Sequence, residues 1–243
     1  MRPILIFKTG SAPAEIVAQR GDFEQWIEAG LGAAPLDVVT LDVPSGASLP
    51  DHDLPGGVVV TGSAAMVSDR EPWSEAAAGW LVEAVRRGTP VFGICYGHQL
   101  LAHGLGGLVG RNPSGREIGT VSIQLNDAAA TDPLLGGTPR AIRAQETHRE
   151  SVLALPPGAV RLAANDADGH QAVRFAERAW GVQFHPEFDA EVSRAYLSIR
   201  RGELLDEDLD PDALLAATGE SPEAARLLAR FAEIVREVEG LGR

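Results

Sequence analysis

The sequence predicts an α/β fold with a mostly parallel central sheet flanked by helices, a small antiparallel extension and a helical C-terminal tail. Short apolar runs alternate with amphipathic helical patterns over residues 1–105, and this rhythm is typical of βαβ units. After residue 108, strand-like runs follow one another with little helix between them. From residue 191 onward the pattern is helical. Parallel strands with helices on both faces place ligands at their carboxyl ends.

The elements of the first half are defined by their apolar periodicity. Runs of β-branched and apolar residues predict strands at 4–7, 36–41, 57–61 and 89–94, and helical spacing predicts helices at 22–31, 72–87 and 97–105. In the second half, the predicted strands are 119–125, 140–146, 160–164, 170–175 and 179–184. We expect these later strands to form the antiparallel extension and to lead the chain back toward the parallel strands.

The residue pattern of the C-terminal tail predicts three helices, over 191–201, 211–218 and 222–239. Asp210 and Ser221 stand where N-caps belong, each followed by a proline. Between the first two helices, the acidic run 202–211 is expected to be a solvated connector. We expect a main domain over 1–200 and a helical extension over 201–243 that packs on the same domain.

The last predicted helix carries an apolar stripe at helical spacing. Its members are Leu227, Leu228, Phe231, Ile234, Val235 and Val238. We interpret the stripe as a core face. The alternative is that it docks a partner or a second copy of the chain, which would give a homodimer.

Composition restricts the class of protein. With 243 residues and 44% hydrophobic content, the chain can bury a full core. The net charge of −13 argues against a nucleic-acid surface, and the sequence contains neither a run of eighteen apolar residues nor a signal-peptide pattern. One cysteine allows no internal disulfide and favours a reducing compartment, so we expect a cytoplasmic protein. No metal-ligand spacing emerges among the six histidines, so we expect no metal and no cofactor.

The single cysteine lies where a nucleophile is expected. Cys95 stands between Gly93 and Gly97, at the turn from a buried strand into a helix. Side chains at the two glycine positions would clash, and such a turn raises the nucleophilic atom above the edge of the sheet. The helix N-terminus that follows favours a thiolate.

A base for this thiol is expected at the end of the strand 179–184. Pro186 favours an extended conformation at His185, so His185 and Glu187 are expected to project to the same side. Glu187 would then orient the imidazole, as in a catalytic triad. An acyl-transfer site also needs an oxyanion hole, for which the backbone N–H groups of Gly62 and Tyr96 are candidates.

The segments Gly93-Ile-Cys95-Tyr-Gly97-His-Gln99 and His185-Pro-Glu187 together resemble the class I glutamine amidotransferases, above all the glutaminase domain of GMP synthase in its stand-alone form. The resemblance covers roughly residues 1–200, about the size of one domain. It implies a flavodoxin-like fold with the thiol, imidazole and carboxylate named above as the triad.

The same resemblance implies two substrate contacts. Gln99 would contact the α-amino or α-carboxylate end of bound glutamine. The segment 146–152 resembles the family's Ser-His-x-Asp-x-Val segment, and there His148 would line the substrate pocket. The sequence departs from the family in the loop after residue 61, where Thr61-Gly62-Ser63 replaces Gly-Gly-Pro.

These observations predict hydrolysis of the γ-carboxamide of glutamine through a γ-glutamyl thioester on Cys95. No phosphate-binding loop of a synthetase occurs in the sequence, so the ammonia would pass to a separate synthetase subunit. The alternative is an autonomous γ-glutamyl peptidase that acts on a γ-glutamyl small molecule. A catalytically silent regulatory or scaffolding member of the fold is a third interpretation, and papain-like proteolysis is a weaker rival. Neither a nucleic-acid nor a membrane partner is expected.

Overall fold

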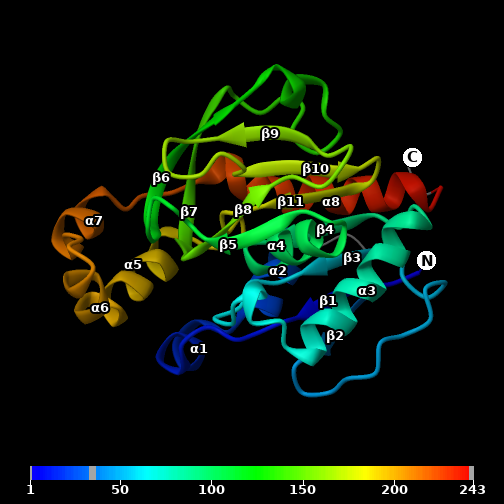
Figure 1. Cartoon of the computed structure of the whole chain (residues 1–243), viewed down its shortest axis with the longest axis horizontal. Coiled ribbons are helices and arrows are strands. Elements are labelled where there is room, and N and C mark those ends of the chain that lie inside the picture. Colours follow the sequence, from blue (N-terminus) through cyan, green and yellow to red (C-terminus); the bar gives the residue numbers. More distant parts are fainter. Residues whose placement is uncertain (1, 33–36, 241–243) are drawn as a thin grey trace.

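The computed structural model describes residues 2–32 and 37–240 and is built around one nine-stranded sheet (Figure 1). The strand order is β2-β1-β3-β4-β11-β10-β9-β6-β7. The first five strands in this order pair in parallel and the remaining four pair antiparallel. The predicted α/β class is therefore confirmed. The strand predicted at 179–184, which was expected in the antiparallel extension, instead joins the parallel part through its pairing with residues 91–94.

The strand bounds agree closely with the predicted runs. The parallel strands are β1 (Ile4–Lys8), β2 (Val38–Asp42), β3 (Gly57–Val60), β4 (Val91–Ile94) and β11 (Ala179–Val182). The antiparallel strands are β10 (Ala172–Ala176), β9 (Val160–Ala164), β6 (Glu117–Leu125) and β7 (Ala141–His148). The start of the run predicted at 36–41 lies outside the described residues. A separate two-stranded sheet of β5 (Leu108–Arg111) and β8 (Glu150–Ala154) was not predicted, because both strands are short and β5 contains a glycine.

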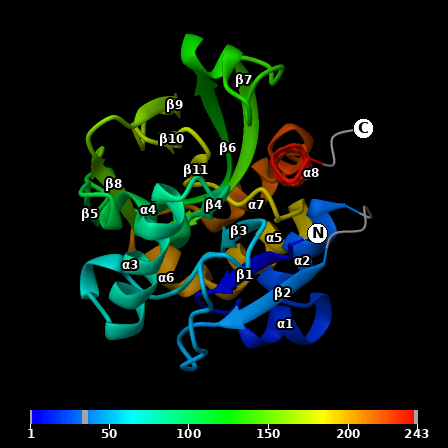
Figure 2. The same ribbon diagram turned by 90° about the vertical axis from the view of Figure 1, so that its right-hand side faces the viewer.

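Helices cover both faces of the sheet (Figure 2). They are α1 (Ala14–Arg20), α2 (Phe23–Leu31), α3 (Pro72–Arg86), α4 (Tyr96–Gly104), α5 (Ala190–Ile199), α6 (Arg201–Asp206), α7 (Pro211–Ala217) and α8 (Pro222–Val238), with short 3₁₀ helices η1 (Val67–Asp69) and η2 (Asp127–Thr131). Alternate residues of β1 serve opposite faces: Ile4 and Ile6 pack with α2 and α8, whereas Leu5 and Phe7 pack with α3 and α4. This two-sided burial explains why the strand reads as a continuous apolar run.

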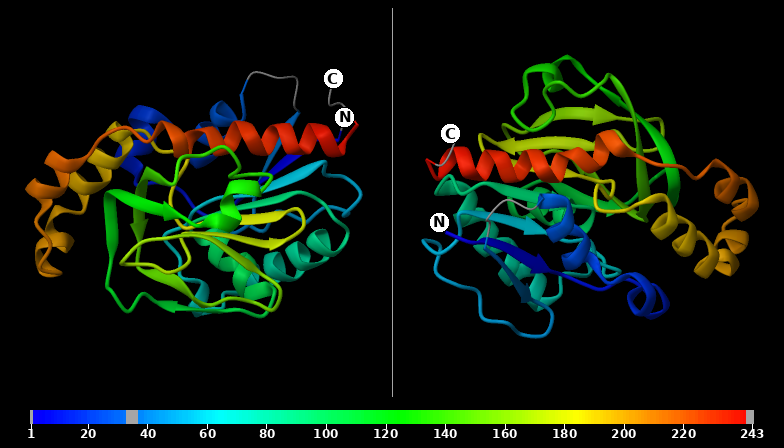
Figure 3. Two further views of the ribbon diagram at one scale, coloured as in Figure 1. Left: turned by 90° about the horizontal axis from the view of Figure 1, so that it is seen from above. Right: turned by 180° about the vertical axis from the view of Figure 1, so that it is seen from behind.

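Helix α8 lies along one face of the sheet from the α7 end to the N-terminal end (Figure 3). Its apolar stripe is buried there, with Phe231 fully buried and its ring 5.5 Å from that of Phe92. Gly57 allows this approach, because a Cβ at that position would lie 2.5 Å from a methyl group of Val235. The stripe is a core face, and the alternative that it docks a second copy is wrong.

Two expectations about the tail also need correction. The helix predicted over 191–201 is broken at Arg200 into α5 and α6. The acidic run is exposed to solvent as expected, but it is more than a connector, because its start forms α6 and its Glu203 and Glu207 bind arginines of the core. The charge pattern alone did not indicate that Arg116 and Arg149 would pair with these carboxylates.

The N-caps of the last two helices differ. The Asp210 side chain accepts the N–H groups of Asp212 and Ala213, as predicted. Ser221 makes no side-chain cap bond to α8, so that prediction is wrong. Its hydroxyl instead accepts a bond from Gln145 Nε2 at 3.3 Å, which ties the start of α8 to β7.

No helix within residues 2–32 and 37–240 is long and apolar enough to cross a membrane.

The glycines flanking Cys95 allow α4 to approach the sheet. A Cβ at Gly97 would lie 2.5 Å from the carbonyl oxygen of Val60, and a Cβ at Gly93 would lie 2.5 Å from the backbone of Gly97. Backbone cannot move aside as a flexible side chain can.

We expect Gly97→Ala to lower the free energy of unfolding by about 1–3 kcal/mol or more, since the added methyl overpacks backbone against backbone. Gly79→Ala is the matched control, because Gly79 lies in α3 with nothing within 4 Å of the added Cβ. That variant is expected to gain ~0.5–1 kcal/mol. Urea unfolding followed by circular dichroism measures both, and equal stabilities would contradict the close approach.

We expect Phe231→Ala to lower the free energy of unfolding by about 3–5 kcal/mol in a single transition, because α8 completes the core of the main sheet. The exposed Arg226 on the same helix provides the control, as Arg226→Ala. A separate early transition for α8 would show that the C-terminal extension is not part of the same cooperative unit.

Candidate active site

The turn that carries Cys95 has a strained backbone. Cys95 has φ 49° and ψ −100°, a conformation that side chains other than glycine adopt rarely. Its N–H donates to the Val182 carbonyl at 2.8 Å, and the N–H of Gly97 donates to the Thr61 carbonyl at 3.2 Å. The turn is thus held from β11 on one side and from the end of β3 on the other. The thiol lines a pocket of ≈ 300 Å³.

His185 and Glu187 form a buried pair, as predicted. His185 Nδ1 donates to Glu187 Oε1 at 2.7 Å. The imidazole stacks on Phe188 with ring centres 4.1 Å apart, and the backbone N–H of His185 donates to the Gln145 carbonyl at 2.8 Å. Ring stacking and backbone anchoring fix the imidazole, with its other nitrogen, Nε2, left free of any hydrogen-bond partner among the described residues.

The electrostatic environment of His185 favours the protonated form. Burial alone favours the neutral imidazole, but the negative charge of Glu187 and the neighbouring Cys95 side chain outweigh it and raise the pKa of His185 to about 10. The structure thus joins His185 to Glu187 by a hydrogen bond and places Cys95 close enough to influence the charge of the imidazole.

Gly62 lies directly against the imidazole. A Cβ at this position would sit 2.8 Å from His185 Cε1. The hydroxyl groups of Thr9 and Thr61 donate to the Gly62 carbonyl at 3.1 and 2.9 Å and fix the orientation of that segment. In the described part of the chain, the N–H groups of Gly62 and Tyr96 have no hydrogen-bond acceptor. Both are available to an oxyanion.

The side chain of Tyr96 does not contribute to this site. Its hydroxyl lies 2.6 Å from Ser74 Oγ, and its ring stacks on Trp73 with centres 5.6 Å apart. Tyr96 therefore offers its backbone to the pocket, whereas its side chain packs the interface of α3 with α4.

Gln99 and His148 both line the Cys95 pocket. The Gln99 amide nitrogen donates to the Glu150 carbonyl at 2.7 Å and to Gln183 Oε1 at 3.0 Å. Gln99 therefore offers a ligand its carbonyl oxygen, an acceptor suited to an ammonium group. Both ring nitrogens of His148 contact protein groups, namely the Glu150 carbonyl at 2.9 Å and Glu117 Oε2 at 3.1 Å. His148 thus shapes the wall of the pocket without a free nitrogen.

Behind His148 lies a buried acidic cluster that the sequence did not reveal. The possible ligand atoms of Glu117, Glu146 and His148 lie within 4.8 Å of one another. Glu117 already accepts bonds from Asn165 at 2.5 Å and Gln171 at 2.8 Å. Burial and the Glu117 charge raise the pKa of Glu146 well above its usual range, which favours its uncharged form. Glu117 thus supports His148 through a hydrogen bond, whereas neither carboxylate oxygen of Glu146 has a hydrogen-bond partner among the described residues. Because the members of the cluster come from β6 and β7, sequence spacing carried no signal of it.

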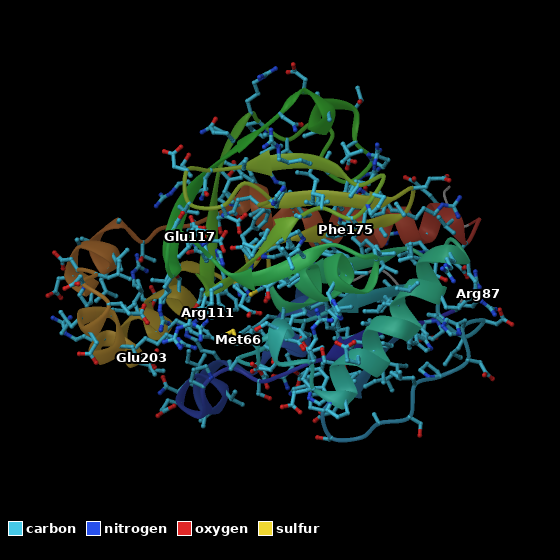
Figure 4. The ribbon with its side chains drawn as sticks, in the orientation of Figure 1. Met66, Arg87, Arg111, Glu117, Phe175 and Glu203 are labelled. Carbon is cyan, nitrogen blue, oxygen red and sulfur yellow. The ribbon has the colours of Figure 1, made fainter. Side chains whose placement is uncertain are left out.

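The mouth of the Cys95 pocket is lined by arginines that the sequence did not identify. Arg116 donates to Glu203 at 2.7 Å and to Glu207 at 2.6 and 2.9 Å. Arg149 donates to the same two carboxylates at 2.8 and 3.1 Å. Figure 4 shows Met66, Arg111 and Glu203 at the side of the core that faces α5 to α7. These ion pairs hold helix α6 beside the pocket.

Another contact, which the sequence did not indicate, fixes the loop after β3. The Glu150 carboxylate accepts bonds from the hydroxyl and the backbone N–H of Ser68 in η1. The loop 63–66, which lines the Cys95 pocket beside Gly62, is therefore tied to the corner between β7 and β8.

Comparison with known proteins agrees with this geometry. Residues 21–199 match the family model of the class-I glutamine amidotransferases. A glutamine-hydrolyzing GMP synthase from Aeropyrum pernix is 32% identical over 201 residues, which is 81% of this chain and 36% of that protein. One subunit of the glutamine-hydrolyzing GMP synthase from Halobacterium salinarum is 31% identical over 153 residues, which is 63% of this chain and 77% of that subunit.

Among solved structures, a glutamine amidotransferase from Thermotoga maritima has the same fold, with a TM-score of 0.72 and 22% identity over 98% of this chain and 99% of that one. Several curated relatives are longer: the alignments cover 55% of a Saccharomyces cerevisiae protein and 24% of a Thermomicrobium roseum GMP synthase. The family match covers most of the chain, including the predicted triad residues Cys95, His185 and Glu187. The chain belongs to the class I glutamine amidotransferase family.

Proposed function

We propose that this chain hydrolyses the γ-carboxamide of glutamine with Cys95 as nucleophile. The observation that carries the proposal is the fixed His185–Glu187 pair, joined at 2.7 Å, beside a cysteine on a strained turn. A protonated imidazole next to the thiol suits a thiolate–imidazolium pair. Two free backbone N–H groups, of Gly62 and Tyr96, stand at the same end of the sheet.

In the proposed reaction, the thiolate attacks the γ-carbonyl carbon and the two N–H groups bind the oxyanion. His185 gives its proton to the departing nitrogen, the C–N bond breaks, and ammonia leaves. The neutral imidazole then takes a proton from water, and the resulting hydroxide attacks the γ-glutamyl thioester. Glutamate leaves, and the thiolate and the imidazolium are restored. Glu187 keeps Nε2 aimed at the reacting atoms throughout.

We further propose that the ammonia passes to a separate synthetase subunit. Relatives named as one subunit of a GMP synthase support this, because their names imply a second subunit. A cytoplasmic location is part of the proposal, since a single reactive cysteine suits a reducing compartment.

The second candidate is an autonomous γ-glutamyl hydrolase. It is favoured by a separate pocket of ≈ 160 Å³ on the His185 side, where ammonia, about the size of a water molecule of ~30 Å³, would occupy only a part. A departing group larger than ammonia would fit there.

Cys95→Ala is expected to lower glutamine hydrolysis at least ~10³-fold, because the thioester can no longer form. Glutamate release from purified protein measures the loss. The control is His103→Ala, whose imidazole bonds Glu75 near the surface, away from the two pockets beside Cys95 and His185. Activity retained by Cys95→Ala would refute the mechanism.

Glu187→Gln is expected to lower the pKa of His185, because it removes a negative charge that raises it. The alkaline limb of kcat/KM should therefore move to lower pH, by about one unit or more. The folded-state pKa of about 10 lies above the ordinary value, so the contribution of His185 to the free energy of unfolding is complete below pH ~6.5. That contribution is lost as the pH rises through about 10.

The matched control for this pH profile is Glu191→Gln, since Glu191 is 56% exposed on α5. Its pH dependence should equal that of the wild type. An alkaline limb that stays in place in Glu187→Gln would show that Glu187 does not set the protonation of His185.

A further inference from the structure

Two adjoining pockets lie on either side of the Cys95–His185 pair. Cys95 and Gln99 line the larger, whereas His185 lines the smaller. The pockets share four wall residues, Ser63, Ala64, Thr147 and Arg200, so they adjoin each other. We call the smaller one the leaving-group pocket, and its walls also include Ala12, Pro13, Phe23 and Tyr196.

The assignment of substrate parts to pockets follows from proton transfer. The group that protonates the departing nitrogen must lie within hydrogen-bond reach of it. Because His185 faces the smaller pocket, the departing amine lies there. The glutamyl part then lies in the larger pocket, where the Gln99 carbonyl oxygen is available to its α-ammonium group.

The walls of the leaving-group pocket combine an apolar part with the polar side chains of Ser11, Ser63 and Thr147. Phe23, Tyr196 and Ala12 are 3%, 4% and 6% exposed and belong to one buried cluster with Ile16 and Phe188. At ≈ 160 Å³, the pocket is larger than ammonia requires. Aromatic and aliphatic walls of this kind favour an apolar side chain of a few carbons.

Besides the His185 imidazolium, an arginine lines this pocket. Arg200, at the break between α5 and α6, lies 5.6 Å from the centre of the Tyr196 ring. Its Nη1 donates to Glu203 at a long 3.3 Å, and its buried Nε–H has no hydrogen-bond partner among the described residues. A guanidinium with free donors matches a carboxylate, which it can bind through two parallel bonds.

We infer that the substrate is a γ-glutamyl amino acid whose second residue has an apolar side chain and a free carboxylate. The side chain packs against Phe23 and Tyr196, and the carboxylate pairs with Arg200. Water is consumed: the γ-carbonyl C–N bond breaks, a C–O bond forms, and glutamate and the free amino acid leave. The inference rests on the proposed attack by Cys95 and deepens the second candidate function, the autonomous γ-glutamyl hydrolase, by naming its substrate class.

The test compares kcat/KM for γ-glutamyl-leucine with that for γ-glutamyl-leucinamide, which lacks only the carboxylate. For the wild type, kcat/KM is expected to be at least ~tenfold higher with the carboxylate substrate, because a charge-assisted hydrogen bond is stronger than a neutral one. In Arg200→Gln this preference should fall to near one, and in Arg200→Lys part of it should return. Arg201→Gln is the matched control, because Arg201 pairs with exposed Asp212 and lines neither pocket, so it should keep the wild-type preference.

A wild-type preference near one, or a preference unchanged in Arg200→Gln, overturns the inference. Thermal unfolding of each variant shows whether it is folded, and the substrate ratio is independent of the amount of active protein. Labelling of Cys95 by a glutamine-like electrophile separates this inference from the proposed function. Labelling without hydrolysis of γ-glutamyl-leucine overturns the inference alone, whereas absence of both overturns both.

Discussion

The contact between the start of α4 and the end of β3 is the constraint on which the site depends. Gly97 lets α4 approach β3 so closely that a Cβ at residue 97 would have no room beside the Val60 carbonyl. This approach forces the chain through the positive φ of Cys95 and raises the thiol above the sheet. The same geometry leaves the N–H groups of Tyr96 and Gly62 without acceptors among the described residues. The positions of the proposed nucleophile and of the proposed oxyanion donors thus depend on the same packing of α4 against β3.

The base reaches the thiol through strand order. Strand β11 pairs in parallel with β4, with Val182 opposite Ile94, so the residues after both strands emerge at one edge of the sheet. The antiparallel strands β10, β9 and β6 extend the sheet beyond β11, and the neighbouring β7 anchors His185 through the Gln145 carbonyl. Stacking on Phe188 and the bond to Glu187 then leave the imidazole with one orientation.

The C-terminal helices complete the surroundings of the site. Helix α5 supplies Tyr196 and ends at Arg200, while α6 places Glu203 and Glu207 on the arginines at the pocket mouth. Three arginines, 116, 149 and 200, share the Glu203 carboxylate. The strength of such shared pairs depends on water exclusion, so closer packing of α6 would strengthen them. The tail therefore combines a core role in α8 with a role beside the site in α5 and α6.

The sequence by itself determined the α/β class, most strand positions, and the cysteine, histidine and glutamate of the site. These signals are local: apolar periodicity, two glycines around a cysteine, and a proline after a histidine. Only the tertiary structure decided the pairing of Arg116 and Arg149 with α6, the Glu117–His148 support and the leaving-group pocket. Each of these joins residues from distant segments, such as Glu117 with His148 and Phe23 with Tyr196. Side-chain contacts of this kind depend on strand order and helix placement, which the local sequence does not indicate.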